Sequence, residues 1–418
     1  MSLINKFKQK DAITNLFFVS ILFLPISLVI GSAFINSNII IIDLIFLYFF
    51  FFRKKNLVEE RKLIILLAIF LLLLTSLIFF SINIENSLVR TFGFLRHALL
   101  VISLVYAFKY LNKENLKLIS QIWFVFVLIV SIDLLVEFFL GYNSLGFKSY
   151  MPGRLVGFMQ DELKIGNLYI GLASFMIGYC MNYYPKNNIL LISLVILVIT
   201  ISFLIGERAN FIRILLITYI VLNLHFFLNK KKNIIYFNII LATILILFAS
   251  LVSVSSSFKV RYYYQLILPI KENGLKDYIE KSIYGKHYNA AYKIFNENKL
   301  TGVGLKNFRV ESFKLDVNQD QLNKKFLGST HPHQIHLEFL AETGIVGYLG
   351  WIIFIILSII YSAKTLYYNF NYFTFCGLIY VAIYICVPLP TGSFFSSYPA
   401  TIFWLNYSLM MTNINKKY

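Results

Sequence analysis

The segment LIILLAIFLLLLTSLIFFSI, residues 63–82, decides the fold of this chain because it is long, apolar and free of charge. In a helix, about 20 such residues cross the roughly 30 Å of hydrocarbon in a bilayer. The 418-residue chain shares this character throughout, since 58% of its residues are hydrophobic and only 14% are charged. A soluble domain of this size could not bury so much apolar surface, so we expect a membrane protein.

Similar apolar segments recur along the chain and predict about twelve transmembrane helices. The second segment is short for a span, and the sixth is interrupted by glycine and asparagine. The expected fold class is therefore an all-α polytopic membrane protein. The predicted spans are 13–35, 38–52, 63–82, 92–111, 118–140, 165–184, 188–206, 209–228, 235–254, 339–363, 371–390 and 398–413.

The charges between the spans set the expected orientation. The short loops after even-numbered spans are basic, as in the run 230–232, and so are both ends of the chain. The positive-inside rule places these loops and both termini in the cytoplasm. The net charge of +18 mostly reflects these anchors, so no nucleic-acid partner is expected.

Four regions follow from this topology. Spans 1–5 occupy residues 1–140, and residues 141–254 hold an outward loop followed by spans 6–9. Residues 255–338 form a large outward loop, and residues 339–418 hold spans 10–12.

Within the large loop, residues 278–298 carry apolar side chains at roughly helical spacing. This spacing predicts an amphipathic helix whose apolar face lies on the protein. The residues of that face are Ile279, Ile283, Tyr288, Tyr292 and Phe295.

The three cysteines, Cys180, Cys376 and Cys386, lie in apolar segments. We expect them to be buried small residues, neither disulfide-bonded nor zinc-binding.

Three arginines are predicted to lie near one outer surface. Arg208 lies at the outer end of the seventh span, just before the eighth begins, Arg154 lies in the loop before the sixth span, and Arg261 follows the ninth. A guanidinium group stays charged and can grip phosphate oxygens with paired hydrogen bonds, so the group suits a pyrophosphate on a lipid carrier. The alternatives are an ion pair of Glu207 with Arg208, snorkelling of Arg208, and phospholipid headgroup binding by the other two.

The stretch THPHQIHLEFLAETGIVG, residues 330–347, places three histidines at the mouth of the tenth span. They are His331, His333 and His336. Because imidazole can take up a proton near neutral pH, one interpretation is general base catalysis. A metal site completed by Glu338 or Glu342 is a second, and structural capping of the span is a third.

The same stretch resembles the signature of bacterial O-antigen ligases, a family whose C-terminal domain the related O-antigen polymerases share. The resemblance lies in His333 and Gln334, then nine residues, then Gly344 and Gly347. Gln334 stands where asparagine is commoner. Three further segments are similar to motifs of that family: GRLVGFMQDELKIGN at 153–167, GERANF at 206–211 and TGVGLKNF at 301–308.

The resemblance implies a GT-C-like, inverting, metal-independent glycosyltransferase that works without a cofactor at the periplasmic face of the bacterial inner membrane. The donor would be a glycan on undecaprenyl pyrophosphate. A ligase would pass it to a sugar of the lipid A core, in lipopolysaccharide biosynthesis. A polymerase would pass it to another lipid-linked repeat unit. We place the ligase first.

In this family's terms, His333 would be the catalytic base, or would orient the acceptor. Arg208, Arg261 and Arg154 would bind the donor pyrophosphate, and His331 would support substrate binding. A transporter for lipid-linked sugars is the alternative from another class. It is disfavoured because transporters hold ionisable groups near the midplane, whereas here the charges gather at the outer ends of the spans.

Overall fold

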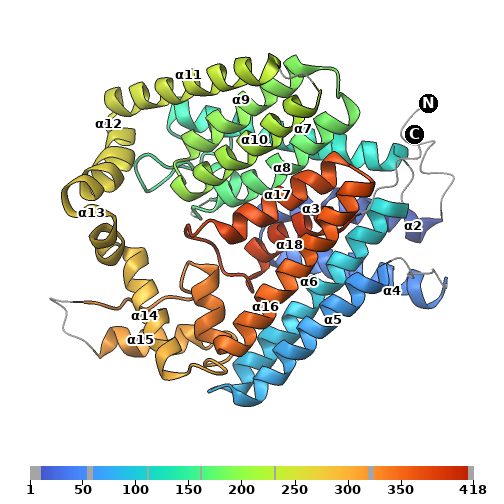
Figure 1. Cartoon of the computed structure of the whole chain (residues 1–418), viewed down its shortest axis with the longest axis vertical. Helices are drawn as coiled ribbons and strands as arrows, with labels where there is room; N and C mark the ends of the chain where they lie inside the picture. The colour runs from blue at the N-terminus through green and yellow to red at the C-terminus, as the bar shows by residue number, and fades with distance from the viewer. Residues whose placement is uncertain are drawn as a thin grey trace.

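The computed structural model of the chain is a bundle of helices, and no strand occurs among the residues that it describes (Figure 1). Those residues are 11–53, 60–110, 113–160, 162–229, 232–318 and 324–412. Long apolar runs fold as helices because hydrocarbon offers the backbone no hydrogen-bond partner except itself. The predicted all-α class is confirmed.

The elements follow one another along the chain with short connections. Two of them, η2 and η3, are 3₁₀ helices, and η4 is a π-helix. The order is α2 Ala12–Leu22, α3 Leu24–Ile30, α4 Ser32–Phe51, α5 Arg61–Ser76, η2 Leu77–Phe80, α6 Ile84–Tyr110, α7 Lys113–Leu140, η3 Gly157–Met159, α8 Ile165–Tyr183, α9 Asn188–Ile205, α10 Arg208–Asn229, α11 Lys232–Val254, α12 Ser256–Phe258, η4 Lys259–Ile267, α13 Leu268–Lys281, α14 Ile283–Glu297, α15 Phe308–Val317, α16 Ile335–Tyr368, α17 Tyr372–Cys386 and α18 Ser397–Met411.

Among the described residues, 8 helices are long and apolar enough to cross a membrane. They are α4, α5 extended by η2, α6, α7, α9, α10, α11 and α16. The pair α2 and α3, bent by 54°, gives a ninth if it is one span. The chain is thus a multi-pass membrane protein, and the number twelve stays a prediction.

The three remaining predicted spans, 165–184, 371–390 and 398–413, coincide with α8, α17 and α18. Nearly every residue of α8 and α18 is buried. These helices pack against one another inside the bundle. Small residues let them approach closely, because a Cβ atom at Gly377 of α17 would lie 2.6 Å from the backbone nitrogen of Met410 in α18.

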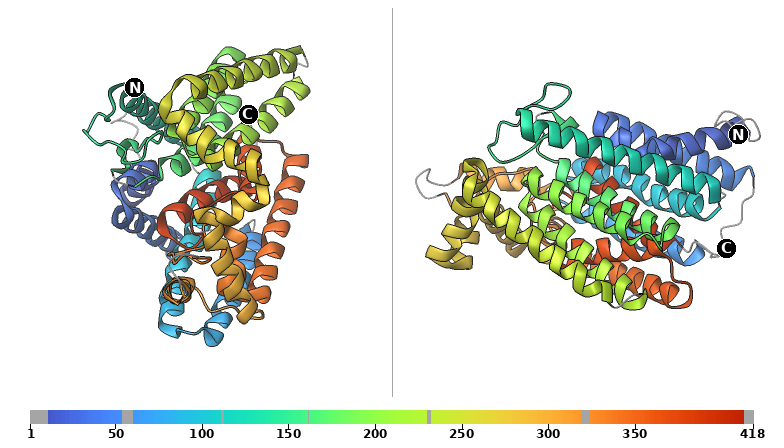
Figure 2. Two further views of the ribbon diagram at one scale, coloured as in Figure 1. Left: turned by 90° about the vertical axis from the view of Figure 1, so that its left-hand side faces the viewer. Right: turned by 90° about the horizontal axis from the view of Figure 1, so that it is seen from above.

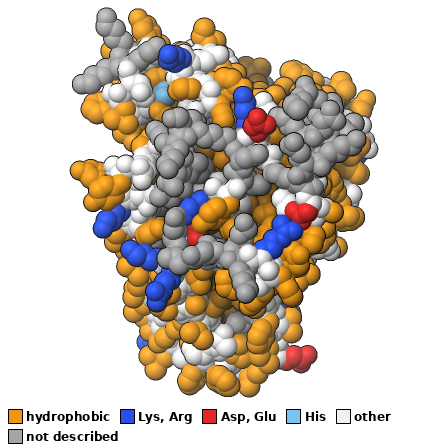
Figure 3. Space-filling view, turned by 90° about the vertical axis from the view of Figure 1, so that its right-hand side faces the viewer, with side chains coloured by type: hydrophobic (Ala, Val, Ile, Leu, Met, Phe, Trp, Pro, Cys, Tyr) orange, Lys and Arg blue, Asp and Glu red, His pale blue; other side chains and the backbone are white. Residues whose placement is uncertain are grey.

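The helices of the large loop gather at one end of the bundle. In Figure 1, α12 to α15 lie on the left and α2 on the right. The right-hand view of Figure 2 shows the yellow helices of the loop and the N-terminus at opposite ends. Figure 3 shows the right-hand face, where Lys and Arg side chains stand among hydrophobic ones. This arrangement fits the predicted topology, whose orientation in the membrane stays a prediction.

The predicted amphipathic helix of the large loop is wrong in its extent and its face. The helix over 278–298 is interrupted at Ser282, whose hydroxyl accepts a hydrogen bond from the Gly285 N–H at 2.9 Å and so begins α14. Ile279, Ile283 and Tyr292 are exposed, whereas Gly285, His287, Ala290, Ala291 and Ile294 are buried. The face with the small residues is buried because α14 packs closely on α16.

Two of the three cysteines, Cys180 and Cys376, are buried as predicted, but Cys386 at the end of α17 is exposed. Each of the three is a free thiol. Cys386 is exposed because it is the last residue of α17.

The close contact of α17 with α18 gives a testable prediction. Gly377→Ala should lower the free energy of unfolding by about 1–3 kcal/mol, because backbone atoms of α18 fill the space that the new methyl group needs. Gly93→Ala in α6 is the control, since no atom lies within 4 Å of the added Cβ there. Thermal unfolding in detergent measures both. Equal stability of the two variants would contradict this packing.

Candidate active site

Arg154, Arg208 and Arg261 meet at the end of the bundle that carries the large loop. The Arg261 Nε–H donates to the Gly206 carbonyl oxygen at 3.0 Å. Arg208 donates to the carbonyl oxygens of Gln265 at 3.0 Å and of Arg261 at 3.4 Å. Arg154 forms an ion pair with Glu207 at 2.8 Å. Three distant parts of the sequence therefore supply one arginine cluster, as predicted.

A tight crossing of two loops brings the cluster together. Gly206 has a φ of +74°, and a Cβ atom there would lie 1.9 Å from the Gly153 carbonyl oxygen. A side chain at Gly206 would therefore hold the Arg154 loop away from α10. The same loop is anchored to α7, because the Glu137 carboxylate accepts hydrogen bonds from the N–H groups of Val156 and Gly157.

The arginine cluster carries more positive than negative charge. Burial lowers the pKa of Arg261 to about 10, and the neighbouring charges of Arg208 and Arg154 act in the same direction. Glu207 is the carboxylate that pairs with Arg154, whereas the hydrogen bonds of Arg208 and Arg261 go to carbonyl, amide and thioether atoms. Arg154 Nε is buried without a partner among the described residues. Such a cluster favours an anion.

His331 and His333 also lie together, with ring centroids 4.0 Å apart. The third ring of this group is His287 of α14, 5.2 Å from His333. His287 is not among the site residues predicted from the sequence. Its spacing from Ala291 and Ile294, four and seven residues on, marks the buried face of α14 and could have identified it.

The histidine group is neutral around pH 7. Burial, with the neighbouring His287, lowers the pKa of His333 to about 4. Burial, with His333 as the next contribution, lowers the pKa of His331 to about 3. A neutral imidazole can accept a proton, which a general base must do.

The backbone at His333 has an unusual conformation. Its φ is +57°, in the left-handed region that residues with a side chain seldom adopt. The His333 carbonyl oxygen accepts a hydrogen bond from the Thr391 N–H at 2.8 Å, which holds this turn. Gln334 then caps α16 by accepting from the Leu337 N–H at 2.8 Å. The His-Gln pair is thus a sharp turn followed by a helix start.

His336 is used structurally. Its two ring nitrogens lie 3.1 Å from the Tyr348 hydroxyl and 2.9 Å from the Ile385 carbonyl oxygen, which ties α16 to α17. Glu338 is also engaged, because its carboxylate accepts from Ser393 Oγ and from the Phe394 N–H. In the described part of the chain, no group of three or more His, Cys, Asp or Glu side chains is placed to hold a metal ion.

The two glycine motifs form one structural unit. Gly344, with a φ of +60°, interrupts α16, and the TGVG segment pairs with the interruption. The N–H groups of Val303 and Gly304 donate to the carbonyl oxygens of Ala341 and Glu342 at 3.0 and 2.8 Å. These two motifs therefore attach the large loop to α16.

Tyr284 at the start of α14 packs against the histidine group and lies within electrostatic range of Arg261. Its ring centroid lies 5.6 Å from that of His333. It is also close enough to Arg261 to contribute to the pKa of that guanidinium group, in the direction opposite to burial. Since 39% of Tyr284 is exposed, the ring is accessible to a ligand.

Arg213 of α10 is a further buried charge that the sequence analysis did not name. Its guanidinium donates to the carbonyl oxygens of Leu389 and Pro390, at 2.9 Å each. Its position inside the predicted span 209–228 could have marked it as a candidate functional residue, because charges at membrane depth are rare and costly.

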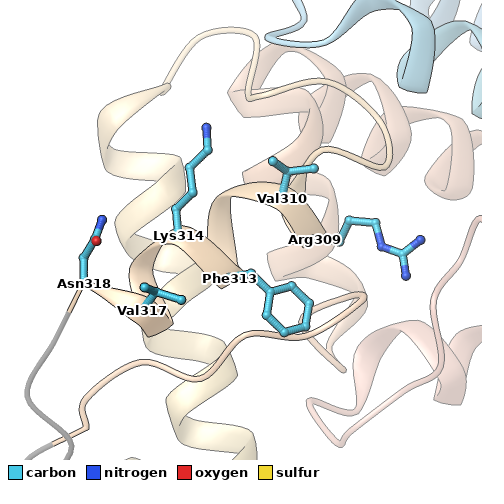
Figure 4. A pocket seen from close by; sticks show the side chains of 6 residues that line it. All are labelled: Arg309, Val310, Phe313, Lys314, Val317 and Asn318. Carbon is cyan, nitrogen blue, oxygen red and sulfur yellow. The ribbon is translucent and has the colours of Figure 1, made fainter.

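A groove of 560 Å³ lies elsewhere, on α15. Figure 4 shows that its lining side chains come from that helix and its end: Arg309, Val310, Phe313, Lys314, Val317 and Asn318. None of them is a site residue predicted from the sequence.

Comparison with known families bears on this geometry. Residues 192–352 match the sequence model of the O-antigen ligase family. This chain contains an O-antigen ligase domain. A search of curated proteins found no match. The O-antigen ligase domain runs from α9 into α16 and includes Arg208, Arg261, His331 and His333, while Arg154 lies before it. The resemblance stated from the motifs is confirmed.

The contrast between His333 and His336 gives a testable prediction about stability. His336→Ala should lower the free energy of unfolding by about 1–3 kcal/mol, because the Tyr348 hydroxyl and the Ile385 carbonyl oxygen lose their partner. His333→Gly should not, because glycine relieves a positive φ that costs about 1 kcal/mol or more. Thermal unfolding in detergent measures both. A His333→Gly variant as unstable as His336→Ala would show that His333 is structural.

Proposed function

We propose that this protein is a GT-C-like inverting glycosyltransferase that moves a glycan from undecaprenyl pyrophosphate to a sugar of the lipid A core at the periplasmic face of the inner membrane. Two observations support the proposal: an arginine cluster with excess positive charge and a neutral histidine pair, with Arg208, Arg261, His331 and His333 inside the O-antigen ligase domain. We place the ligase first, and a polymerase that joins lipid-linked repeat units is the alternative.

The arginine cluster would bind the donor pyrophosphate. Arg208 and Arg261 remain charged, and their present partners are mostly neutral acceptors that leave further N–H groups to bind phosphate oxygens. The partnerless Nε–H of Arg154 is a third donor. Pyrophosphate departs with negative charge, so fixed guanidinium groups would stabilise it as the glycosidic bond breaks, without a metal ion.

His333 would be the base. Its imidazole would take the proton from the acceptor hydroxyl as that oxygen attacks the anomeric carbon of the donor glycan. The bond from the anomeric carbon to the phosphate oxygen breaks, and the electron pair leaves with the pyrophosphate. Attack from the face opposite to the leaving group inverts the configuration. His331 would support binding, because its Nε2 is buried and has no partner among the described residues.

Tyr284 marks where the transferred sugar would lie. An inverting reaction needs the anomeric carbon between the leaving phosphate and the base. Tyr284 packs beside His333 and lies within electrostatic range of Arg261, so it would stand near the sugar in such an arrangement. Its accessible ring offers a flat surface to a sugar ring.

The pyrophosphate assignment predicts the effect of removing Arg208. Arg208→Ala should reduce glycan transfer by about 100-fold or more, because a charge that stabilises the leaving group is lost. Arg309→Ala on α15 is the control, an arginine of the large loop outside the site. The assay is transfer from a lipid-linked donor by purified protein, with thermal unfolding measured in parallel. Normal transfer by a folded Arg208→Ala protein would contradict the assignment.

The glycans of a deletion strain separate the two reactions. Long chains stranded on the carrier lipid are expected for a ligase. Single repeat units, on the carrier or on the core, would instead show a polymerase.

The assignment of His333 as base predicts the order of two histidine variants. His333→Ala should lose far more transfer activity than His331→Ala, and the reverse order would make His331 the base.

The low pKa of His333 predicts the pH dependence. The active imidazole is neutral, so kcat/KM should hold as the pH falls and decline only as the pH approaches about 4. The unfolded chain takes up protons already below about 6.5, so stability falls with pH before activity does, and initial rates must be used. An acid limb near pH 6.5 would contradict the assignment of a buried His333 as base.

A further inference from the structure

We propose that Arg213 is a positioning residue that fixes His333 relative to the arginine cluster, through the loop 387–396 between α17 and α18. This inference rests on the proposed function, because it assigns a task to Arg213 in the reaction of His333. Arg213 itself touches neither the pyrophosphate nor the acceptor in this scheme.

The surroundings of Arg213 show what it holds. The residue is only 1% exposed. Its guanidinium donates to the Leu389 and Pro390 carbonyl oxygens at 2.9 Å each and lies over the Tyr384 ring, 5.2 Å from the centroid. A buried charge is costly, and here carbonyl dipoles and an aromatic face balance it in place of a carboxylate. This forked grip fixes two consecutive residues of the loop 387–396.

The next residue of that loop reaches the histidine. The Thr391 N–H donates to the His333 carbonyl oxygen at 2.8 Å. His333 stands in a left-handed conformation, which persists only where its surroundings hold it. Arg213 therefore acts on His333 through three consecutive residues of backbone.

The rest of the loop 387–396 is held from two other helices. Glu338 of α16 accepts from the Phe394 N–H at 2.8 Å and from the Ser393 hydroxyl. Arg90 of α6 donates to the Phe395 carbonyl oxygen at 2.7 Å. With Arg213 from α10, three helices fix a segment that has no regular structure of its own.

The other side of Arg213 leads to the arginine cluster. Its Nη1 donates to Asn210 Oδ1 at 3.3 Å, and Asn210 Nδ2 donates to Glu207 Oε2 at 2.6 Å. Glu207 pairs with Arg154 at 2.8 Å. Glu207 immediately precedes α10, and Asn210 and Arg213 follow at intervals of three, so neighbouring side chains can meet along the start of this helix. A continuous polar chain thus runs from Arg154 to His333.

This series of polar contacts would set the distance between the leaving phosphate and the base. Transfer needs both groups correctly placed relative to the anomeric carbon, and a displacement of about 1 Å can cost about 100-fold in rate. Loss of Arg213 frees the Leu389 and Pro390 carbonyl groups, and the Thr391 contact to His333 with them. The expected defect is in turnover, with little change in donor binding.

The test compares Arg213→Gln and Arg213→Lys with Ser362→Ala. Ser362 also donates from a buried side chain to a main-chain oxygen, that of Met410 at 2.8 Å, but it lies outside the site. Arg213→Gln should lower kcat about 100-fold with donor KM changed by less than about threefold. Arg213→Lys, which keeps the charge but not the fork, should be intermediate. Ser362→Ala should retain wild-type turnover.

A double-mutant cycle shows whether Arg213 works through His333. In a His333→Ala background, Arg213→Gln should change the residual single-turnover rate less than about twofold, because the group that it positions is gone. A full further loss in that background would overturn the inference, as would wild-type kcat in Arg213→Gln. If Arg213→Gln does not fold, Arg213→Lys carries the same cycle. Full activity of His333→Ala would instead refute the proposed function.

Discussion

A guanidinium group cannot give up its charge, and this fold buries or half-buries four of them at one end of a helix bundle. Arg154 has the carboxylate of Glu207. Arg208, Arg213 and Arg261 are held chiefly by carbonyl and amide oxygens. Carbonyl dipoles orient a cation without cancelling its charge, so the end of the bundle keeps an excess of positive charge. The tight crossing at Gly206, the π-helix η4 and the loop 387–396 all serve to place these groups.

His333 and His336, three residues apart, have different surroundings because α16 begins between them. His333 precedes the helix and stands in a left-handed turn, with its ring beside His331 and His287. His336 lies in the first turn, where both of its nitrogens find partners in the protein. An imidazole whose two nitrogens are both hydrogen-bonded is unavailable to a substrate, whereas the half-buried His333 ring has no hydrogen-bond partner among the described residues. The sequence alone shows three equivalent histidines, and helix phase separates them.

Much of this molecule could be predicted from local sequence. Apolar length identified the spans, because each span must satisfy its backbone internally. The positions of Arg154, Arg208 and Arg261 at outer ends of spans predicted that they would meet. The motif around His333 predicted the family. These features depend on composition and on neighbours in the chain.

What sequence could not supply are contacts between distant segments. The two carbonyl partners of Arg213 lie in a loop more than 170 residues further along the chain, at separations of 176 and 177. His287 reaches His333 because α14 packs on α16 through small residues, and apolar spacing had pointed to the opposite face of that helix. Likewise α8, α17 and α18 are interior helices whose neighbours decide their environment. The glycines of α8 and α17 weaken the apolar signal and at the same time permit close packing.

The central claim is that the arginine cluster and His333 face one donor. The most direct measurement is a cryo-electron microscopy structure of the whole protein with a short polyprenyl pyrophosphate bound. The account predicts pyrophosphate density against Arg208 and Arg261, with the anomeric side of the phosphate directed past Tyr284 toward His333. A pyrophosphate bound away from these arginines, or His333 facing away from it, would contradict the account.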